Sequence, residues 1–418
     1  MRIAIIGAGV SGLVCAHQLH ADHELVLFEA SDRVGGHANT VRVETDAGVH
    51  DIDTGFIVFN DRNYPNFERL LDELDVATQA SRMSFGVSDG ANFEYNGASP
   101  NGLFATRSKL IDPSFHRMIA DLVRFNRDAR ELLASEEDPS LCDWLAQQRY
   151  SSAFVERLIV PQASAVWSAD PAQMWSFPAR FLVEFFDNHG MLGLRNRPRW
   201  QTISGGSRTY VEALTRPWRE RIRLSSAVTE VTRHPDHIIV SARGCEPERF
   251  DAVVLATHSD QALALLGDPS ERERELLGAI PYQSNEAVLH TDRSLLPRRR
   301  RAWASWNYHL AEAVTGRCTV TYHMNQLQSL QADCEFCVTL NRTDAIDPQR
   351  IIRTIQYAHP VYTSAGRAAQ LRHHEISGRN RTHYCGAYWG WGFHEDGVRS
   401  ALRVVGELGA ARALAVSA

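Results

Sequence analysis

The chain has almost no lysine and no long apolar run. Among its 44 lysine and arginine residues, Lys109 is the single lysine. No stretch approaches the roughly eighteen uncharged apolar residues that a membrane-spanning helix needs, so we expect no such helix. The net charge of −6 gives no basic surface for nucleic acid, and we expect no nucleic-acid partner.

Cysteine is also scarce. The seven cysteines are odd in number and scattered, which excludes a disulfide framework and indicates reduced thiols in a cytoplasmic protein. Cys334 and Cys337 form a C-x-x-C without a second pair, so we interpret them as buried thiols on a strand and expect no metal site. An apolar content of 44% over 418 residues is enough for a large core and for two domains.

The first dozen residues carry the strongest signal. A short β-branched run, Arg2–Ile6, is followed by G-A-G-V-S-G (residues 7–12) and then by a helical pattern. A buried strand that turns through spaced glycines into a helix is typical of a dinucleotide site, where the helix N-terminus meets the pyrophosphate. The predicted cofactor contacts in this turn are Gly7, Gly9, Ser11 and Gly12. Because the run is the first nucleotide-binding strand, we do not interpret it as a signal peptide.

A second predicted strand, Glu24–Glu29, ends in an acid. Glu29 lies about twenty residues beyond Gly9, where a carboxylate that binds the ribose of the nucleotide is expected. An acid at this position disfavours a 2′-phosphate, so NADP is not expected.

A second glycine pair favours FAD over NAD. Gly35 and Gly36 follow the acidic strand and bring another stretch of backbone close to the same ligand, which a shorter dinucleotide does not need. The sequence Asp53-Thr54-Gly55-Phe56 offers one more tight backbone approach.

The segment E-A-S-D-R-V-G-G-H-A-N-T (residues 29–40) resembles the signature of the flavin amine oxidase and phytoene desaturase superfamily. That superfamily usually has arginine after the glycine pair, where this chain has His37. Ile203–Arg208 is similar to the family's central glycine pair before a helix, and Tyr384–Ala387 with Gly392–Val398 is similar to its closing flavin motif. The resemblance implies FAD that is held non-covalently, because no cysteine stands in the family's attachment context.

The resemblance also implies which residues contact FAD. The backbone of Val228 is expected at the adenine, and the helix that begins in the closing motif is expected near flavin N1 and O2, where its dipole favours negative charge. Beyond the first turn, the implied contacts are Glu29, Ala30, Arg33, Gly35, Gly36, His37, Asn39, Thr40, Gly55, Phe56, Val228, Thr257, Gly386, His394, Glu395, Gly397 and Val398.

These motifs predict an α/β protein whose Rossmann-like FAD-binding domain, of the amine oxidase type, is interleaved with a substrate domain of mixed sheet and helices. We assign residues 1–80, 196–262 and 378–418 to the FAD-binding domain, and 81–195 and 263–377 to the substrate domain. A site between two domains takes its walls from both. Within the second substrate block we expect strands at Glu286–His290, Cys318–Tyr322 and Phe336–Leu340, and a helix near Pro348–Ala358.

Within the superfamily, A-W-A-S-W-N-Y (residues 302–308) and Y-C-G-A-Y-W-G-W-G-F-H-E-D-G (residues 384–397) resemble a bacterial clade of predicted NAD/FAD-binding proteins. Members of this clade often occur beside methyltransferases similar to cyclopropane fatty acid synthases, and the clade is linked to furan fatty acid synthesis. The resemblance therefore implies desaturation of a methyl-branched acyl chain of a membrane lipid, and a neighbouring methyltransferase as a partner.

The chemistry belongs to the flavin, and the protein supplies position and electrostatics. Flavin amine oxidases usually place a lysine near flavin N5, but the matching stretch, Tyr282–Val288, has none. We therefore favour an apolar substrate and expect Trp389, Trp391 and Phe393 to line its slot. His394 is the candidate catalytic residue, because an imidazole there can take a proton near neutral pH; in the alternative interpretation only its backbone contacts the flavin.

Two other functions remain open at this point. One is oxidation of a polar amine or amino acid, and the other is a non-catalytic flavoprotein that supports a lipid methyltransferase. Each of two basic segments also has two interpretations. The helical pattern around Phe115–Arg130 and the arginine run at 298–301 are either ordinary solvated surfaces or contacts with an anionic bilayer at the inner face of the membrane.

Overall fold

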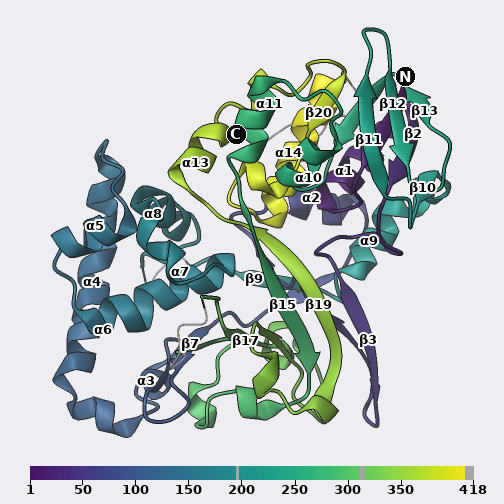
Figure 1. Ribbon diagram of the computed structural model, residues 1–418. Coiled ribbons are helices and arrows are strands. Elements are labelled where there is room, and N and C mark those ends of the chain that lie inside the picture. Colours follow the sequence, from purple (N-terminus) through teal and green to yellow (C-terminus); the bar gives the residue numbers. More distant parts are fainter. Residues whose placement is uncertain (194–196, 311–315, 410–418) are drawn as a thin grey trace.

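The computed structural model describes residues 1–193, 197–310 and 316–409 (Figure 1). The upper part of the molecule in Figure 1 is built around a parallel sheet, and the lower part around a larger mixed sheet. Two long paired strands, β15 (Tyr282–His290) and β19 (Ile351–Pro360), extend from one part into the other.

The parallel sheet takes its strands from distant parts of the chain. Its order is β10 (Ile222–Arg223), β2 (Glu24–Phe28), β1 (Arg2–Ile6), β14 (Ala252–Leu255) and β20 (Thr382–Tyr384). Ile3 lies opposite Leu25 on one side and Ala252 on the other. The strands read as continuous apolar runs because both faces of the sheet are covered.

Alternate residues of these strands enter two different cores. Ile3 and Ile5 pack with helices α1 (Val10–Leu19) and α14 (His394–Glu407), whereas Ala4 and Ile6 pack beneath another layer of strands and helices. The first face also carries α2 (Pro65–Glu73) and α9 (Arg208–Thr215). The second carries β11 (Val228–Arg233), β12 (Ile238–Ala242), β13 (Glu248–Phe250), α10 (Ser259–Leu265) and α11 (Glu271–Gly278).

Near opposite ends of the chain, α1 and α14 lie side by side in the first core. The thiols of Cys15 on α1 and Cys385 after β20 are 3.9 Å apart and buried. A Cβ atom on Gly397 of α14 would lie 2.6 Å from Val10 Cγ1, so this glycine is needed for the close packing of the two helices. The two helices therefore begin next to each other.

The mixed sheet has the order β19, β15, β18 (Cys337–Leu340), β17 (Val320–His323), β16 (Trp306–His309), β7 (Phe85–Ser88) and β8 (Glu94–Asn96). Its neighbours are antiparallel except β16 and β7. Two smaller sets complete the strands: the hairpin of β3 (Thr40–Thr45) and β4 (Gly48–Asp53), and the sheet of β5 (Phe59–Asn60), β9 (Trp200–Ile203) and β6 (Thr78–Ala80).

A group of helices lies beside the mixed sheet, at the left of Figure 1. It comprises α3 (Pro100–Leu103), α4 (Pro113–Ala134), α5 (Leu141–Gln147), α6 (Ser152–Phe154), α7 (Val160–Trp167) and α8 (Ala179–Asn188). The short helices α12 (Met324–Leu327) and α13 (Ser364–Gln370) lie elsewhere in the chain. Most of the large apolar side chains of α4, α7 and α8 enter one core with the mixed sheet.

The mixed α/β fold predicted from the sequence is confirmed. The expected helix near 348–358 is wrong, because only Pro348–Arg350 forms a short 3-10 turn and Ile351 begins the long strand β19. That strand is rich in β-branched residues, and its full-length pairing with β15 outweighs the helical signal. Positions 194–196, 311–315 and 410–418 of the predicted domain blocks lie outside the described residues.

Several charged groups of the two basic segments form ion pairs within the protein. Asp121 of α4 forms ion pairs with Arg117 and Arg124 of the same helix, and Arg299 bonds to the buried Glu94 at 2.9 Å. Within the described ranges, no helix is long and apolar enough to cross a bilayer.

Candidate active site

A large cavity runs between the two parts of the molecule. Its volume is about 1230 Å³, and its walls come from the first glycine turn, from α8 and from both long strands β15 and β19. Pockets for one small ligand usually measure about 300–1,000 Å³, so this cavity has room for more than one molecule.

The glycine turn after β1 forms one wall of this cavity. A Cβ on Gly12 would lie 1.9 Å from the carbonyl oxygen of Gly7, so Gly12 lets α1 pack against its own strand. Gly9 differs, because a Cβ there would meet nothing within 4 Å and would project into open space. Gly36 approaches Gly9 so closely that its Cβ would lie 3.1 Å from Gly9 Cα. The two glycine loops therefore form one narrow backbone cradle at the N-terminus of α1.

The acid at the end of β2 lines the same cavity. One carboxylate oxygen of Glu29 accepts from the amide of Ala8 at 2.8 Å, and the other accepts from the amide of Ser31 at 2.9 Å. Val228, at the start of β11, lines the cavity as well. Both residues therefore lie where the nucleotide end of a dinucleotide was expected.

Most of the predicted cofactor contacts line this cavity: Gly7, Gly9, Ser11, Glu29, Ala30, Gly35, Gly36, His37, Gly55, Phe56, Val228, Thr257, Gly386 and His394. The remaining ones lie behind its walls: Gly12, Arg33, Asn39, Thr40, Glu395, Gly397 and Val398. The residues of the second group support the cavity wall but do not form its inner surface. Arg33, for example, donates at 2.9 Å to the carbonyl of Gly36 and holds the second glycine loop.

Two further members of that group also support the wall from behind. Asn39 donates through Nδ2 to Thr54 Oγ1 at 2.9 Å and to the Tyr357 hydroxyl at 3.1 Å, which fixes a ring that does line the cavity. Val398, a residue of α14, is fully buried in the core that this helix shares with α1.

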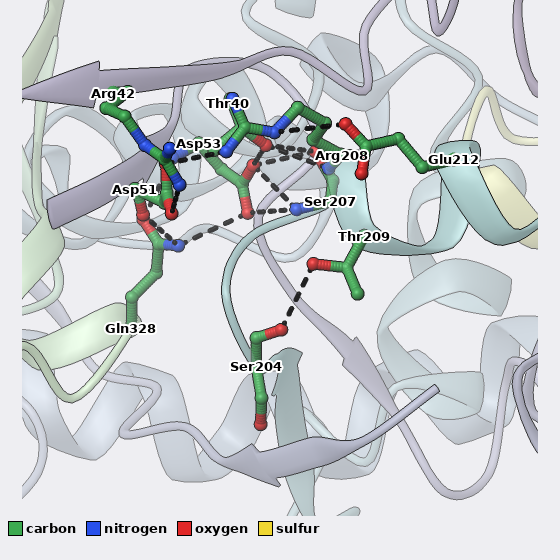
Figure 2. A network of polar contacts seen from close by, with 10 residues as sticks. All are labelled: Thr40, Arg42, Asp51, Asp53, Ser204, Ser207, Arg208, Thr209, Glu212 and Gln328. Atoms are coloured by element: carbon green, nitrogen blue, oxygen red, sulfur yellow. Dashed lines mark hydrogen bonds and ion pairs between the residues drawn. The ribbon is translucent and has the colours of Figure 1, made fainter. Parts of the chain in front are cut away.

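Thr40 belongs to a buried polar network, shown in Figure 2. Its hydroxyl donates to Asp53 at 2.6 Å, and Asp53 also accepts from the amide of Ser207 at 2.9 Å and from the Ser207 hydroxyl at 2.7 Å. Gln328, which follows α12, reaches the same carboxylate at 3.3 Å. Burial raises the pKa of Asp53 to about 6 in spite of these donors. This network fastens the β3–β4 hairpin to the central glycine pair and to α12.

The first turn of α14 is held by two carboxylates. Asp396 accepts from the amides of Trp391 at 3.0 Å and Phe393 at 3.1 Å, and burial raises its pKa to about 6. Glu395 points the other way, to the start of α2, where it accepts from the amide of Phe67 at 3.0 Å and from Asn66 Nδ2 at 2.6 Å. Glu395 therefore joins two helices, and its side chain does not enter the cavity.

His394 lines the cavity but is poorly suited to accept a proton. Its ring stacks on Phe56 with the ring centres 3.5 Å apart, and its Nε2 lies 2.8 Å from the Tyr210 hydroxyl. Burial lowers the pKa of His394 to about 3, so the imidazole is neutral and weakly basic at neutral pH. The geometry therefore supports a packing role for this ring.

Of the three aromatic residues that were predicted to line the substrate slot, two line the cavity and one does not. Trp391 and Phe393 line the cavity, and Phe393 stacks on Phe185 of α8 with the ring centres 5.1 Å apart. Trp389 does not line it; its ring packs edge-on against His373 at 4.6 Å in the core beneath the parallel sheet. Trp389 is the last residue of a short 3-10 turn, Ala387–Trp389, and Trp391 follows that turn, so the two side chains enter different surroundings.

Several lining residues were not predicted from the sequence: His258, Tyr282, Tyr357, His359, Trp167 and Phe185. A signal existed for His258, because it follows the predicted strand Asp251–Thr257, and ligands of α/β sheets bind beyond the carboxyl ends of strands. Tyr357 was hidden by the mistaken helix near Pro348–Ala358. His359 lies just beyond that range, two residues further along β19, and alternation along the strand places both residues on the same face.

The residues present fit an extended FAD. The glycine cradle leaves open space at Gly9, the N-terminus of α1 offers free amides, and the buried Nε2 of His37 has no hydrogen-bond partner among the described residues. A diphosphate satisfies amide and imidazole donors of this kind. No group of three or more potential metal ligands occurs in the portion of the chain that the structure describes.

The chain belongs to a known family. Residues 10–315 match the model of the flavin containing amine oxidoreductases. The protein is therefore a member of this flavin-dependent family, and FAD is its cofactor.

Among curated proteins, the chain is 26% identical over 290 residues to a Mycobacterium tuberculosis protein classed as the flavin-containing monoamine oxidase AofH. The match covers 64% of this chain and 59% of that protein, so the chain spans about three fifths of the relative's length.

Solved structures share the fold over nearly the whole chain. Cyclohexylamine oxidase from Brevibacterium oxydans superimposes with a TM-score of 0.68 at 16% identity, over 97% of this chain and 99% of that one. A fatty acid isomerase from P. acnes that produces CLA superimposes with a TM-score of 0.69 at 16% identity, over 98% of each chain. At this identity the likeness establishes the fold alone.

Proposed function

We propose that the protein is an FAD-dependent oxidoreductase that desaturates an apolar chain-like substrate, most specifically a methyl-branched acyl chain of a membrane lipid. The observation that carries this proposal is the charge of the cavity wall. Among the described lining residues, Glu29 is the only carboxylate, it lies at the nucleotide end, and no lysine is present. A cationic substrate would find no counter-charge beside the flavin.

The substrate end of the cavity is apolar and aromatic. Side chains from the helical group, the mixed sheet and the closing motif line it, among them Met83, Phe85, Val166, Trp167, Phe185, Trp306, Leu340, Trp391 and Phe393. Burying an acyl chain against such a wall stabilises the complex by about 0.8 kcal/mol for each methylene group. The fold itself is compatible with such a substrate, because it is also that of a fatty acid isomerase.

Two arginines stand at the wall formed by the chain just before β9. Arg197 and Arg199 line the cavity, and the side chain of Arg199 is 89% exposed while it pairs with Asp61 at 2.8 Å. Guanidinium groups recognise carboxylates and phosphates through paired N–H donors. We place the anionic head of the substrate here, with the acyl chain directed inward.

Bound FAD supplies the hydride acceptor for the oxidation. Transfer of a hydride to that acceptor, with loss of a proton from the adjacent carbon to solvent, would leave a carbon–carbon double bond. The chain's own part is to align this substrate and to exclude water, and the rings of Phe185 and Phe393 do so by stacking at the cavity wall.

Oxidation of an amine is the second candidate function. It is favoured by the sequence match to a protein classed as a monoamine oxidase. The aromatic side chains at the substrate end also suit a neutral amine. This function predicts hydrogen peroxide and an imine product from simple amines.

A peripheral contact with an anionic bilayer would deliver such a lipid. Leu110 and Ile111, just before α4, are 50% and 86% exposed, and Val123 on α4 is 68% exposed among arginines. Apolar side chains among cations suit a membrane interface. We propose that this surface docks at the cytoplasmic face of the membrane, where a lipid methyltransferase would act on the same substrate.

The experiment is an anaerobic reaction of the FAD-loaded enzyme. Vesicles that contain methyl-branched phospholipids are expected to bleach the flavin absorbance and to yield a lipid that lacks two hydrogen atoms by mass spectrometry. A panel of amines and amino acids is tested in parallel. Bleaching by amines alone would replace the proposal with the second function, and bleaching by neither, with stable FAD binding, would favour a non-catalytic partner of a methyltransferase.

A further inference from the structure

A relay of side-chain hydrogen bonds ends at His359, which lies on β19 and lines the cavity. Asn341 begins the relay. Its Oδ1 accepts from the amide of Glu286 at 2.9 Å, so its Nδ2 is the donor end of the side chain. That Nδ2 donates to the carbonyl of Cys318 at 2.9 Å and to Oδ1 of Asn285 at 2.7 Å. Backbone groups, whose roles as donor or acceptor cannot change, therefore fix the orientation of Asn341.

The orientation of Asn285 follows from that of Asn341. Because Oδ1 of Asn285 is an acceptor, its Nδ2 must be the donor in its other two contacts. It donates to the carbonyl of Ser168 at 3.1 Å and to Nδ1 of His359 at 2.9 Å. Nδ1 of His359 is therefore an acceptor, and the proton of the neutral ring lies on Nε2.

The relay also keeps the ring of His359 uncharged. A proton on Nδ1 would face an N–H group of Asn285, so an imidazolium would lose this hydrogen bond. Burial, with a smaller contribution from His258, lowers the pKa of His359 to about 4. The ring is thus a neutral donor at pH 7, and its Nε2–H forms no hydrogen bond with the residues that the structure describes.

Two residues of the relay have unusual backbone conformations. Ser168 ends α7 with φ 50°, and Asn341 follows β18 with φ 53°. Residues other than glycine rarely adopt positive φ, and such conformations persist where the surrounding structure holds them. Asn285 on β15 is fully buried and is hydrogen-bonded to both residues. Two constrained turns therefore hold the side chain that orients His359.

His359 lies between the glycine cradle and the aromatic part of the cavity. Its ring centre is 5.3 Å from that of His37, which follows Gly36 of the cradle. In the other direction the relay reaches Ser168, which lines the cavity beside Trp167 of α7. In FAD the flavin ring is joined to the diphosphate through the ribityl chain. With its diphosphate at the cradle, the flavin half of the cofactor must continue along the cavity past His359.

We propose that His359 donates a hydrogen bond from Nε2 to a carbonyl oxygen of the flavin ring, and that Asn285 positions it for this role. The bond is stronger to the reduced ring, because reduction places more negative charge on the ring oxygens. A neutral donor favours the reduced cofactor without placing an unpaired charge in a buried site. The inference rests on the cofactor, which family membership establishes, and is independent of the substrate proposed above.

The test measures the midpoint potential of the bound flavin against a reference dye. His359→Leu should weaken binding of the reduced ring relative to the oxidised ring roughly tenfold, which lowers the potential of this two-electron couple by about 30 mV. His359→Gln keeps an N–H donor near the position of Nε2 and should recover most of this loss. His234→Leu is the matched control and should leave the potential unchanged, because His234 is exposed between β11 and β12 and does not line the cavity.

Nitrogen NMR of the FAD-loaded enzyme with isotopically labelled histidine measures the tautomer independently. The signal of His359, assigned by its absence in His359→Leu, should show the proton on Nε2. Asn285→Asp replaces the donor to Nδ1 by an acceptor of the same shape, so Nδ1 should then carry a proton. A proton on Nδ1 in the wild type would refute the relay.

The flavin contact is overturned by any of three results. The potential of His359→Leu could rise or stay the same, which would show that no donor stabilises the reduced ring. A weaker Kd for FAD with an unchanged potential would place the donor at the ribityl chain instead. An equal loss of potential in His359→Gln would show that the shape of the ring, and not its N–H group, is what matters.

Discussion

Replacing Gly9 by alanine should separate FAD binding from folding. Gly9 adopts φ −74° and ψ 178°, which any residue can adopt, and an added Cβ would meet no protein atom within 4 Å. The apoprotein should therefore tolerate the change. The new methyl group would project into the cavity at the cradle, where the backbone must approach the diphosphate of FAD.

The size of the effect follows from crowding one methyl group into a close contact. Such overpacking costs about 1–3 kcal/mol, which corresponds to a Kd for FAD roughly five- to 150-fold weaker. Gly12→Ala provides the contrast, because its Cβ would lie 1.9 Å from the Gly7 carbonyl oxygen and must disturb the packing of α1 itself. That variant should lower the free energy of unfolding of the apoprotein.

The assay pairs two measurements on the apoprotein. Urea unfolding gives the free energy of unfolding, and quenching of flavin fluorescence gives the Kd for FAD. Gly9→Ala should unfold at nearly the same urea concentration as the wild type. If Gly9→Ala bound FAD as tightly as the wild type, or if its apoprotein were as destabilised as that of Gly12→Ala, the placement of the diphosphate at Gly9 would be refuted.

Three further predictions follow from the site. Burial raises the pKa of Asp53 from 3.8 to about 6, so the folded state binds the proton more tightly and this group loses stability as pH rises through that window. The free energy of unfolding of Asp53→Asn should therefore gain up to about 3 kcal/mol relative to the wild type between pH 4 and pH 7. His394→Asn, loaded with FAD, should keep turnover within about tenfold, since loss of a true proton acceptor costs about 10²–10⁴ in rate. Val166→Trp should fill the proposed substrate end of the cavity. The variant should keep its FAD content but lose at least roughly tenfold in kcat/KM for an acyl lipid. Unchanged kinetics would show that the substrate lies elsewhere.

The strand–turn–helix unit at the start of the chain was the part best predicted from sequence, and the reason is physical. The roles of Gly7, Gly9, Gly12 and Glu29 follow from steric limits on a strand–turn–helix unit, and these limits are local in the sequence. The mixed α/β fold follows for the same reason, because buried strands and amphipathic helices have different periods.

The aromatic part of the cavity was harder to predict, because it is assembled from distant segments. Phe185 of α8 meets Phe393 only after the chain has folded, and nothing near either residue signals that contact. Tyr357 was missed because a helix was expected near Pro348–Ala358, where pairing with β15 makes the strand β19 instead. Trp389 was wrongly expected to line the cavity, because it lies in a short 3-10 turn that the sequence did not reveal and its ring packs in the core of the parallel sheet.

The most direct test of the cavity's function is a visible absorption spectrum recorded during an anaerobic titration. The purified protein should carry FAD, and a methyl-branched acyl phospholipid should abolish its absorbance while simple amines leave it unchanged. A protein that takes up no FAD, or a flavin that responds to amines and not to the lipid, would contradict the proposal that one continuous cavity holds the cofactor and an apolar chain together.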